Sequence, residues 1–318
     1  MKNNQFPNIE DIQTAAGRIS QYIHHTPVMT CQSLNDISGA NIYFKCENFQ
    51  KVGAFKFRGA TNAVFSLSEK ELSKGVATHS SGNHAQALAL AARNRGAKAY
   101  IVMPNNAPTV KIDAVKGYNG EIIFCEPTLK AREETLAKVV KKTGATFIHP
   151  YNDDRIITGQ ATAAMELIEE ISNLEIIMAP VGGGGLLSGT ALATNYFSPK
   201  TVVFGAEPER ADDACRSLKS GKIIPSVNPQ TIADGLLTSL GTKTYPIIRK
   251  YVSDILTVSE KNIIQAMKLI WERAKIIVEP SGAVPFAVTL QHKEKFLGKK
   301  VGIIISGGNI DLKALPWQ

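Results

Sequence analysis

The sequence predicts an α/β fold in which parallel sheets are covered by helices on both faces. Two observations support this prediction. Short, continuously apolar segments rich in β-branched residues recur along the chain, and segments with helical periodicity separate them. The strands are expected at residues 40–47, 75–81, 98–104, 120–125, 146–150, 175–181, 201–207 and 301–306.

Helix signals occupy the intervals between these strands. Residues 83–95 have the periodicity of a helix, and Gly96 is placed to end it. Pro108 is suited to the first position of a further helix that runs to about Gly117. No long linker, repeat or low-complexity segment is present, so any division into domains must come from the winding of the chain.

Composition bounds the class of protein. The 318 residues are 44% hydrophobic and 20% charged, which is typical of a globular chain with one or two domains. Lys+Arg exceed Asp+Glu by 36 to 28, giving a formal net charge of +8, but the lysines are scattered and form no run of like charge. We therefore expect a solvated basic surface and no nucleic-acid partner.

The cysteines and the apolar segments favour a cytoplasmic location. Cys31, Cys46, Cys125 and Cys215 are too widely spaced for a zinc or redox motif, and a chain of this size needs no disulfide framework. The first residues lack the apolar core of a signal peptide, and no run of 18 apolar residues occurs. These features predict a cytoplasmic protein with no membrane partner.

Polar and glycine-rich motifs stand at strand ends, where open parallel sheets bind their ligands. The first motif, VGGGGLLSG at 181–189, contains Gly182, Gly183, Gly184 and Gly185 directly before a helix. Their backbone N–H groups can converge on an anion beside the positive end of that helix. Four successive glycines exceed what a strand-to-helix turn requires, so phosphate binding is favoured over a simple turn.

The motif alone does not decide which phosphate is bound. The spacing of Gly183, Gly185 and Ser188 nearly matches the dinucleotide fingerprint, and Glu207 ends the next strand where a ribose-binding acid belongs. An NAD-dependent oxidoreductase is therefore an alternative, weakened because Ser188 replaces the third glycine. No Gly-Lys-Ser/Thr follows, which excludes a Walker-type loop.

The second motif, GAFKFRGA at 53–60, places Lys56 between two phenylalanines, Phe55 and Phe57. Partial desolvation would lower the pKa of the Lys56 amine and favour Schiff-base chemistry. For this motif alone, a surface lysine on a basic loop is the simpler interpretation.

Two further motifs complete the set. The third, SSGNH at 80–84, offers hydroxyl and amide groups to a carboxylate, although capping of the following helix explains one of them equally well. The fourth, SGGN at 306–309, follows an apolar strand, and the Ser306 hydroxyl would point from the strand end into the site.

In their order along the chain, the four motifs resemble the fold-type II pyridoxal-phosphate enzymes, most closely the serine racemase and serine/threonine dehydratase family. The resemblance covers nearly the whole chain, from HTPVMT at 25–30 to SGGNIDL at 306–312. It implies a tryptophan synthase β-like fold with two domains. Residues 1–74 and 153–318 would form a large cofactor-binding domain, and residues 75–152 a small mobile one.

The resemblance also implies the roles of individual residues. Lys56 would bind pyridoxal phosphate covalently, Asn83 would contact its 3′-oxygen, and Ser306 would face its pyridine nitrogen. Phe55 would flank the ring, and the four glycines would hold the phosphate. The positions implied in substrate recognition are Ser80, Ser81, His84, Arg132 and Ser239.

The implied activity is dehydration of L-serine and L-threonine to a 2-oxo acid and ammonia, with some racemisation of serine. Lys56 would be the base, and Ser81 would be the proton donor that racemisation needs on the opposite face. Ser81 favours the racemase-like branch, whereas Tyr151 replaces an asparagine of the animal serine racemases and recurs among dehydratases. A dedicated serine racemase, a 3-hydroxyaspartate dehydratase and a β-replacement enzyme of the cysteine synthase kind are alternatives.

A metal, an effector and a partner are implied in the same way. Glu207, Ala211 and Asp213 match the family's divalent-cation loop, whose oxygen ligands suit Mg²⁺, Ca²⁺ or Mn²⁺. This role takes Glu207 away from a ribose and weakens the oxidoreductase alternative. The family is often dimeric, so a homodimer is expected. Part of the ATP-effector pattern of animal members is kept, at Cys31, Gln32, Ser33, Lys51 and Val52.

Overall fold

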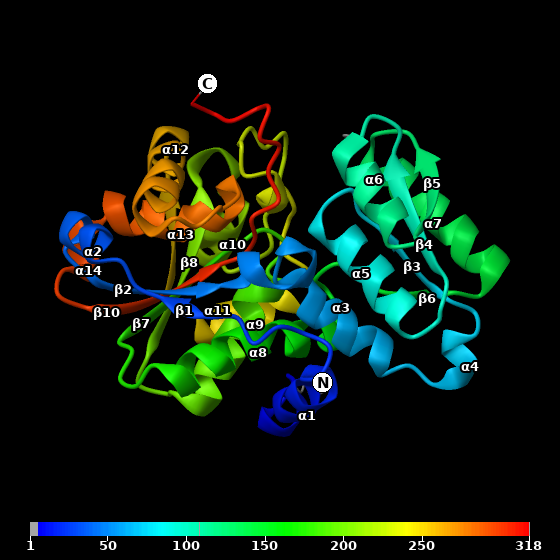
Figure 1. The fold of residues 1–318 in the computed structure, drawn as a ribbon, viewed down its shortest axis with the longest axis horizontal. Helices are drawn as coiled ribbons and strands as arrows, with labels where there is room; N and C mark the ends of the chain where they lie inside the picture. The colour runs from blue at the N-terminus through cyan, green and yellow to red at the C-terminus, as the bar shows by residue number, and fades with distance from the viewer. Residues whose placement is uncertain (1–5, 108, 318) are drawn as a thin grey trace.

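The computed structural model describes residues 6–107 and 109–317, and it contains two β-sheets covered by helices (Figure 1). The predicted α/β fold class is confirmed, because every expected strand overlaps an observed one. The segment expected at 146–150 is shorter than predicted and ends at Phe147. Two observed strands, Val28–Met29 (β1) and Asp254–Val258 (β9), were not expected.

The larger sheet has the strand order β1-β2-β10-β7-β8-β9. Its other strands are Asn41–Cys46 (β2), Ile176–Pro180 (β7), Val202–Pro208 (β8) and Lys300–Ile305 (β10). All neighbouring strands are parallel except β1 and β2. Because β10 lies between β2 and β7, segments from both ends of the chain meet in the middle of this sheet.

The smaller sheet has the order β5-β4-β3-β6, with every neighbouring pair parallel. Its strands are Val76–His79 (β3), Ala99–Pro104 (β4), Glu121–Cys125 (β5) and Thr146–Phe147 (β6). All four strands come from one continuous stretch of the chain. That this stretch moves as a separate domain over residues 75–152 stays a prediction.

Helices separate most of the strands. They are Ile9–Ile19 (α1), Gln32–Ser38 (α2), Lys56–Phe65 (α3), Glu69–Leu72 (α4), Asn83–Asn94 (α5), Thr109–Gly117 (α6), Leu129–Thr143 (α7), Asp154–Glu170 (α8), Gly185–Phe197 (α9), Asp213–Ser220 (α10), Thr244–Tyr251 (α11), Glu260–Leu269 (α12), Pro280–Gln291 (α13) and Lys293–Phe296 (α14). Short 3₁₀ segments are Glu47–Phe49 (η1), Lys51–Gly53 (η2), Glu209–Ala211 (η3) and Asp234–Leu236 (η4), and Ile270–Ala274 (η5) is a π-helical turn. Helix α5 ends just before Gly96, whose φ is +66°. Pro108, predicted to begin a helix, lies outside the described residues.

The larger sheet is covered on both faces, by α12 and α13 on one side and by α8 and α9 on the other (Figure 1). Successive strand residues point to opposite faces. Accordingly, Ile303 packs in the same cluster as Phe286 of α13, and Ile304 packs in the cluster that contains Leu187 of α9. This arrangement explains why the central strands are continuously apolar.

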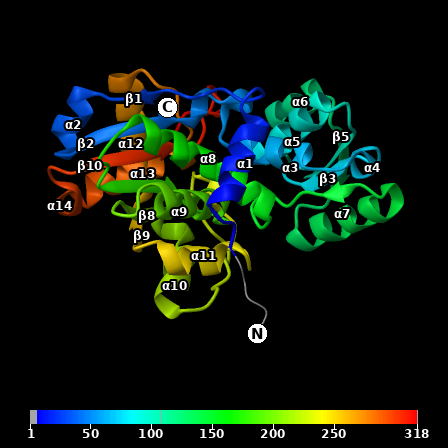
Figure 2. The ribbon, with the colours of Figure 1, turned by 90° about the horizontal axis from the view of Figure 1, so that it is seen from below.

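Helices α5 and α7 lie on opposite sides of β3 in the smaller sheet (Figure 2). Leu88 of α5 packs in one cluster with Ile101, and Leu136 of α7 packs in another with Val102. Both faces of this sheet are therefore buried as well. In the part of the chain that the structure describes, no helix combines the length and the apolar character needed to span a membrane.

Candidate active site

Lys56 begins α3 and is half-buried at the place where the two sheets meet. Its Nζ donates a hydrogen bond to the Pro150 carbonyl oxygen at 2.8 Å and lies 5.1 Å from the centroid of the Phe55 ring. Burial lowers the pKa of the Lys56 amine to about 8, and the nearby Glu279 carboxylate opposes this shift. The amine is therefore neutral, and nucleophilic, in an appreciable fraction of molecules near neutral pH.

The four-glycine loop connects β7 to α9 and is completely surrounded by protein. A Cβ atom at Gly183 would lie 2.3 Å from the Tyr151 ring, and one at Gly182 would lie 2.9 Å from the Leu236 Cα. At Gly184 the backbone has a φ of +88°, which favours glycine. Within residues 6–107 and 109–317, no acceptor receives a hydrogen bond from the N–H groups of Gly182 to Gly185. This loop therefore fits a phosphate cradle at the start of a helix.

A second helix fixes the orientation of that loop. Thr244 of α11 donates its hydroxyl to the Gly183 carbonyl oxygen at 2.8 Å, so the N–H of the same planar peptide points the opposite way. Ser188 donates to the Thr244 carbonyl oxygen at 3.2 Å. The serine that replaces the third glycine of a dinucleotide fingerprint therefore supports the loop through α11.

Asn83, Glu279 and Asn309 form a hydrogen-bonded cluster between the two sheets. The Asn83 amide donates to both oxygens of Glu279, at 3.0 and 3.1 Å. Asn309 donates its side-chain amide to the Asn83 oxygen at 2.9 Å and its backbone N–H to Glu279 at 3.1 Å. Burial raises the pKa of Glu279 to about 7, and Asp234 adds to the effect.

Glu279 was not identified from the sequence. The only local signal is a glutamate directly before Pro280 at the first position of α13, which occurs at many helix starts. Gly307, in the fourth motif, packs directly against the Glu279 carboxylate. A Cβ atom there would lie 2.7 Å from a Glu279 carboxylate oxygen, so this glycine makes room for the buried acid.

Ser306 lies at the end of β10 and is buried, beside the segment that leads into Lys56. The Phe55 N–H donates to the Ser306 carbonyl oxygen at 3.0 Å, and Ala54 forms an isolated antiparallel bridge with Gly307. The second and fourth motifs, far apart in the sequence, are therefore adjacent in the fold.

The SSGNH segment contributes hydroxyl groups and an imidazole to the same region. The Ser80 hydroxyl accepts a hydrogen bond from the Gly82 N–H at 3.3 Å, and the Ser81 side chain forms no hydrogen bond with the other described residues. His84 is buried, with its Nε2 3.3 Å from the Ile148 carbonyl oxygen. Burial holds the pKa of His84 well below its ordinary value, and the Lys56 charge acts in the same direction.

His149 is a second neutral imidazole, and sequence reasoning missed it. Its Nδ1 accepts hydrogen bonds from the backbone N–H groups of Tyr151 and Asn152, at 3.3 and 3.0 Å, which leaves the proton on Nε2. Burial lowers the pKa of His149 to about 4. The His149 ring is 4.6 Å from the Tyr151 ring, so this histidine supports the residue that covers Gly183.

The two remaining substrate positions differ in their surroundings. The Nε atom of Arg132, on α7, is buried and has no hydrogen-bond partner among the described residues. Its positive charge adds to the burial that lowers the pKa of His79. The Ser239 hydroxyl accepts a hydrogen bond from the Ser226 N–H at 2.8 Å, its only side-chain hydrogen bond among the described residues.

The predicted cation loop places two carboxyl groups in a buried position. Glu207 accepts hydrogen bonds from the N–H groups of Ala214 and Cys215, at 2.9 and 2.8 Å, and burial raises its pKa to about 9. Burial also raises the pKa of Asp213 to about 6. Both Asp213 carboxylate oxygens are buried without a hydrogen-bond partner among the described residues, which suits a ligand of a hard cation.

Ala211, the third expected ligand, is buried and would contribute a carbonyl oxygen. In residues 6–107 and 109–317, no group of three or more His, Cys, Asp or Glu side chains is arranged to hold a metal. A site here would therefore depend on the backbone and on water for its remaining ligands. The metal stays a prediction.

Comparisons with known proteins show the family to which the chain is similar. The family model described as pyridoxal-phosphate dependent enzyme matches residues 19–307. A β-hydroxyaspartate dehydratase of Paracoccus denitrificans is 52% identical over 312 residues, covering 98% of this chain and 99% of its own. An L-threo-3-hydroxyaspartate ammonia-lyase of Saccharomyces cerevisiae is 49% identical, covering 96% and 94%. The crystal structure of serine racemase from Dictyostelium discoideum has a TM-score of 0.92 at 51% identity, covering 96% of this chain and 99% of that one.

Proposed function

This chain belongs to the family of pyridoxal-phosphate-dependent enzymes, and from that premise we propose that it dehydrates 3-hydroxyaspartate to oxaloacetate and ammonia. The names of two relatives support this substrate. The sequence predicts serine and threonine as the main substrates, with 3-hydroxyaspartate as an alternative. The relatives favour the alternative. Because the chain belongs to a pyridoxal-phosphate-dependent family, the alternative of an NAD-dependent oxidoreductase is set aside.

The residues present fit the cofactor. Lys56 supplies an amine of lowered pKa, the four-glycine loop supplies N–H groups for the phosphate, and Ser306 supplies a hydroxyl for the ring nitrogen. When bound, pyridoxal phosphate supplies the electron sink that stabilises a substrate carbanion. The protein supplies orientation and proton transfer.

Lys56 is the proposed base. Its Nζ takes the α-proton of the substrate, and the lowered pKa keeps a neutral fraction available for this step. The β-hydroxyl takes up the proton that Nζ accepted and leaves as water, and a second water then hydrolyses the resulting enamine to the 2-oxo acid and ammonia. The overall change, 3-hydroxyaspartate to oxaloacetate plus ammonia, consumes no oxidant or reductant.

The observation that carries the choice of substrate is the buried, unpartnered Nε of Arg132. A buried donor without an acceptor is costly, and a carboxylate is the ligand that a guanidinium binds best. The SSGNH segment at the start of α5 is suited to the α-carboxylate. 3-Hydroxyaspartate has a second carboxylate for Arg132, whereas serine has none.

The test is a comparison of substrates. Purified enzyme is given each isomer of 3-hydroxyaspartate, L-serine and L-threonine, and oxaloacetate, pyruvate and 2-oxobutyrate are measured. We expect kcat/KM for one 3-hydroxyaspartate isomer to exceed that for L-serine at least tenfold. Arg132→Gln should remove this preference while largely sparing serine, and Arg95→Gln, at an ion pair with Glu69, is the matched control. A preference for serine in the unmodified enzyme would contradict the proposal.

Serine racemisation is the second candidate, supported by the similarity to the Dictyostelium enzyme and by Ser81 at the position of the opposite-face proton donor. It is measured as D-serine formed from L-serine in the same preparations. Activation by a divalent cation, an ATP effector and assembly as a homodimer also stay proposals that come from the resemblance.

A further inference from the structure

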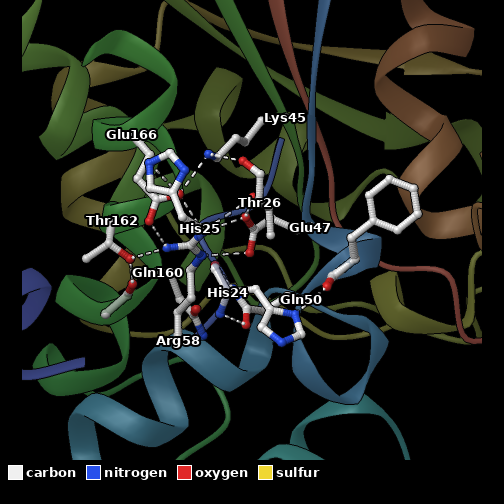
Figure 3. A network of polar contacts seen from close by, with 12 residues as sticks. His24, His25, Thr26, Lys45, Glu47, Gln50, Arg58, Gln160, Thr162 and Glu166 are labelled. Atoms are coloured by element: carbon white, nitrogen blue, oxygen red, sulfur yellow. Dashed lines mark hydrogen bonds and ion pairs between the residues drawn. The ribbon is translucent and has the colours of Figure 1, made fainter. Parts of the chain in front are cut away.

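A cluster of charged side chains lies buried between β2, α3 and α8, and Figure 3 shows its members as sticks. Arg58, at its centre, follows Lys56 by two residues in α3. Arg58, Lys45 and Glu47 have no exposed surface, and Glu166 is 7% exposed. Buried charges are costly unless they are paired and hydrogen-bonded. The arrangement of this cluster therefore calls for an explanation.

Arg58 is at the centre, and every N–H of its guanidinium has a partner. Glu47 accepts from Nε at 2.7 Å and from Nη2 at 2.8 Å. Glu166 accepts from Nη1 at 2.6 Å and from Nη2 at 2.7 Å, and Thr162 accepts from Nη1 at 3.1 Å. Two bidentate carboxylates fix both the position and the plane of the guanidinium.

The two carboxylates are themselves held in place. Lys45 forms an ion pair with Glu166 and donates a hydrogen bond to the Thr26 carbonyl oxygen, at 2.7 Å each. The Thr26 hydroxyl donates to Glu47 at 2.6 Å. Arg58 with Glu47 and Glu166, which we call the Arg58 clamp, is therefore held by several partners at once. Lys45 also donates to the partly exposed Glu170 at 3.2 Å, where the network reaches the surface.

The clamp joins the two segments that meet at Lys56. Arg58 follows Lys56 by two residues in the same helix, which places the two side chains about 200° apart around the axis. Glu47 lies on the segment that leads into α3, and Glu166 lies on α8, the helix that follows Pro150. Lys56 donates to the Pro150 carbonyl on the other side.

Glycines alone would leave the rotation of α3 undetermined. A Cβ atom at Gly159 of α8 would lie 2.6 Å from the Gly59 Cα, so the two helices touch along their backbones. Such a contact sets the distance between helices but resists rotation only weakly, because glycine has no side chain to interlock. Arg58, one residue before Gly59, adds a side-chain constraint beside two others, because the Gln160 side chain accepts from the Gly59 N–H at 3.1 Å and the Asn62 amide donates to the Arg155 carbonyl oxygen at 2.7 Å.

We infer that Arg58 is a positioning residue: clamped by Glu47 and Glu166, it sets the rotation of α3 and holds the Lys56 amine against Pro150. Stability alone does not explain the network, because a buried ion cluster is commonly no more stable than an apolar one of similar size. The inference rests on the proposed function for the role of Lys56.

Four variants test the inference. Arg58→Lys keeps the charge and loses the bidentate geometry. Thr162→Val keeps the volume and leaves all ion pairs intact, and it removes the hydroxyl that accepts from Arg58 and donates to the Gly159 carbonyl oxygen, so it tests the network where Arg58→Lys does not fold. Arg95→Lys removes a guanidinium from an ion pair with Glu69 and is the matched control. Lys56→Ala identifies signals that arise from other lysines.

The first readout is the rate at which cofactor-stripped enzyme binds added pyridoxal phosphate through Lys56, followed by visible absorbance across pH. Borohydride reduction and peptide mass locate the label. We expect Arg58→Lys to slow this reaction at least tenfold and to move its pH midpoint upward. Thr162→Val should slow it two- to threefold. In the reloaded enzymes kcat should fall with KM unchanged within twofold, and Arg95→Lys should match the unmodified enzyme.

The outcomes separate the two claims. If the unmodified enzyme gives no label on Lys56, the proposed function fails. If it is labelled, and each variant that folds reacts at the unmodified rate with the unmodified pH profile, the Arg58 inference fails. Loss of thermal stability without a change in rate or pH profile would equally show that the network is only structural.

Discussion

Asn83, at the start of α5 beside the smaller sheet, donates its amide to both carboxylate oxygens of Glu279, at the start of α13 on the larger sheet. The contact spans 196 residues of sequence and joins the two halves of the site. Burial raises the pKa of Glu279 to about 7, so its charge changes near neutral pH. Protonation of Glu279 therefore changes the charge at a contact that joins the two sheets.

Replacing Glu279 should change how stability depends on pH. The unfolded glutamate ionises near pH 4.5 and the folded one near 7, so the folded state binds more protons between these values and loses stability as pH rises through them. In Glu279→Gln this loss, up to about 3 kcal/mol, should be absent. Denaturant unfolding from pH 4 to 8 measures it. The exposed Glu121→Gln is the control, and parallel curves for Glu279→Gln and the unmodified protein would contradict the assignment.

The cation loop predicts stabilisation by a divalent ion. Asp213 is buried with no hydrogen-bond partner among the described residues, so a bound ion would relieve its isolation. Chelation should lower the thermal midpoint by several degrees, and Mg²⁺, Ca²⁺ or Mn²⁺ should restore it. Asp213→Asn should abolish the response, whereas Glu209→Gln, exposed in the same loop, should keep it. If chelation leaves the thermal midpoint unchanged and the purified protein contains no metal, the predicted cation site does not exist.

Ser81 predicts a separation of two activities. Racemisation needs a proton donor on the face opposite Lys56, whereas elimination needs only the base and a leaving group. Ser81→Ala should therefore abolish formation of D-serine and leave dehydration within about threefold of the unmodified enzyme. The two products are measured in one reaction, with Ser73→Ala, at the exposed end of α4, as the control. Equal loss of both activities would refute the assignment.

Lys111 of α6 and Asp234 of η4 form an ion pair that joins the two sheets, near the Asn83–Glu279 contact. Both side chains are partly exposed, so the pair adds little to global stability but can hold a closed arrangement. Lys111→Asp should raise KM several-fold at low salt with a smaller change in kcat. The exchanged double variant, Lys111→Asp with Asp234→Lys, should restore KM. Failure of the exchange to restore KM would show that the pair does not act through its charges.

Local signals explain what the sequence could predict. Apolar strands, the glycine loop and the small residues around Lys56 each specify a structure within a few positions, and these elements were expected. Strand β9 was missed because it lies at the sheet edge and begins with a charged residue, Asp254. Strand β1 has only two residues.

The missed site residues depend on distant partners. Glu279 acquires its role from Asn83 and Asn309, and its own segment contains no motif. The tautomer of His149 is set by a backbone turn that presents two N–H groups to Nδ1. No pattern of residues in the sequence predicts this geometry. The Arg58 clamp joins three separate segments, although the arginine itself lies within a recognised motif. Local sequence patterns predict most of the strands and helices, but they do not predict the contacts between distant segments.

The final prediction concerns the pH dependence of Lys56 itself. Burial lowers its pKa to about 8 in the folded state, against 10.5 for an ordinary lysine, so the unfolded chain binds more protons between these values. The free energy of unfolding should therefore rise with pH from about 8 to 10.5. Below pH 8 the charged amine should destabilise the folded state by its full amount. In cofactor-free protein, Lys56→Met should be more stable than the unmodified chain at pH 7, and this advantage should vanish near pH 10.5. Denaturant unfolding at both pH values checks it, with the exposed Lys70→Met as control. An advantage that persists unchanged at pH 10.5 would mean that the gain comes from packing rather than from the removed charge.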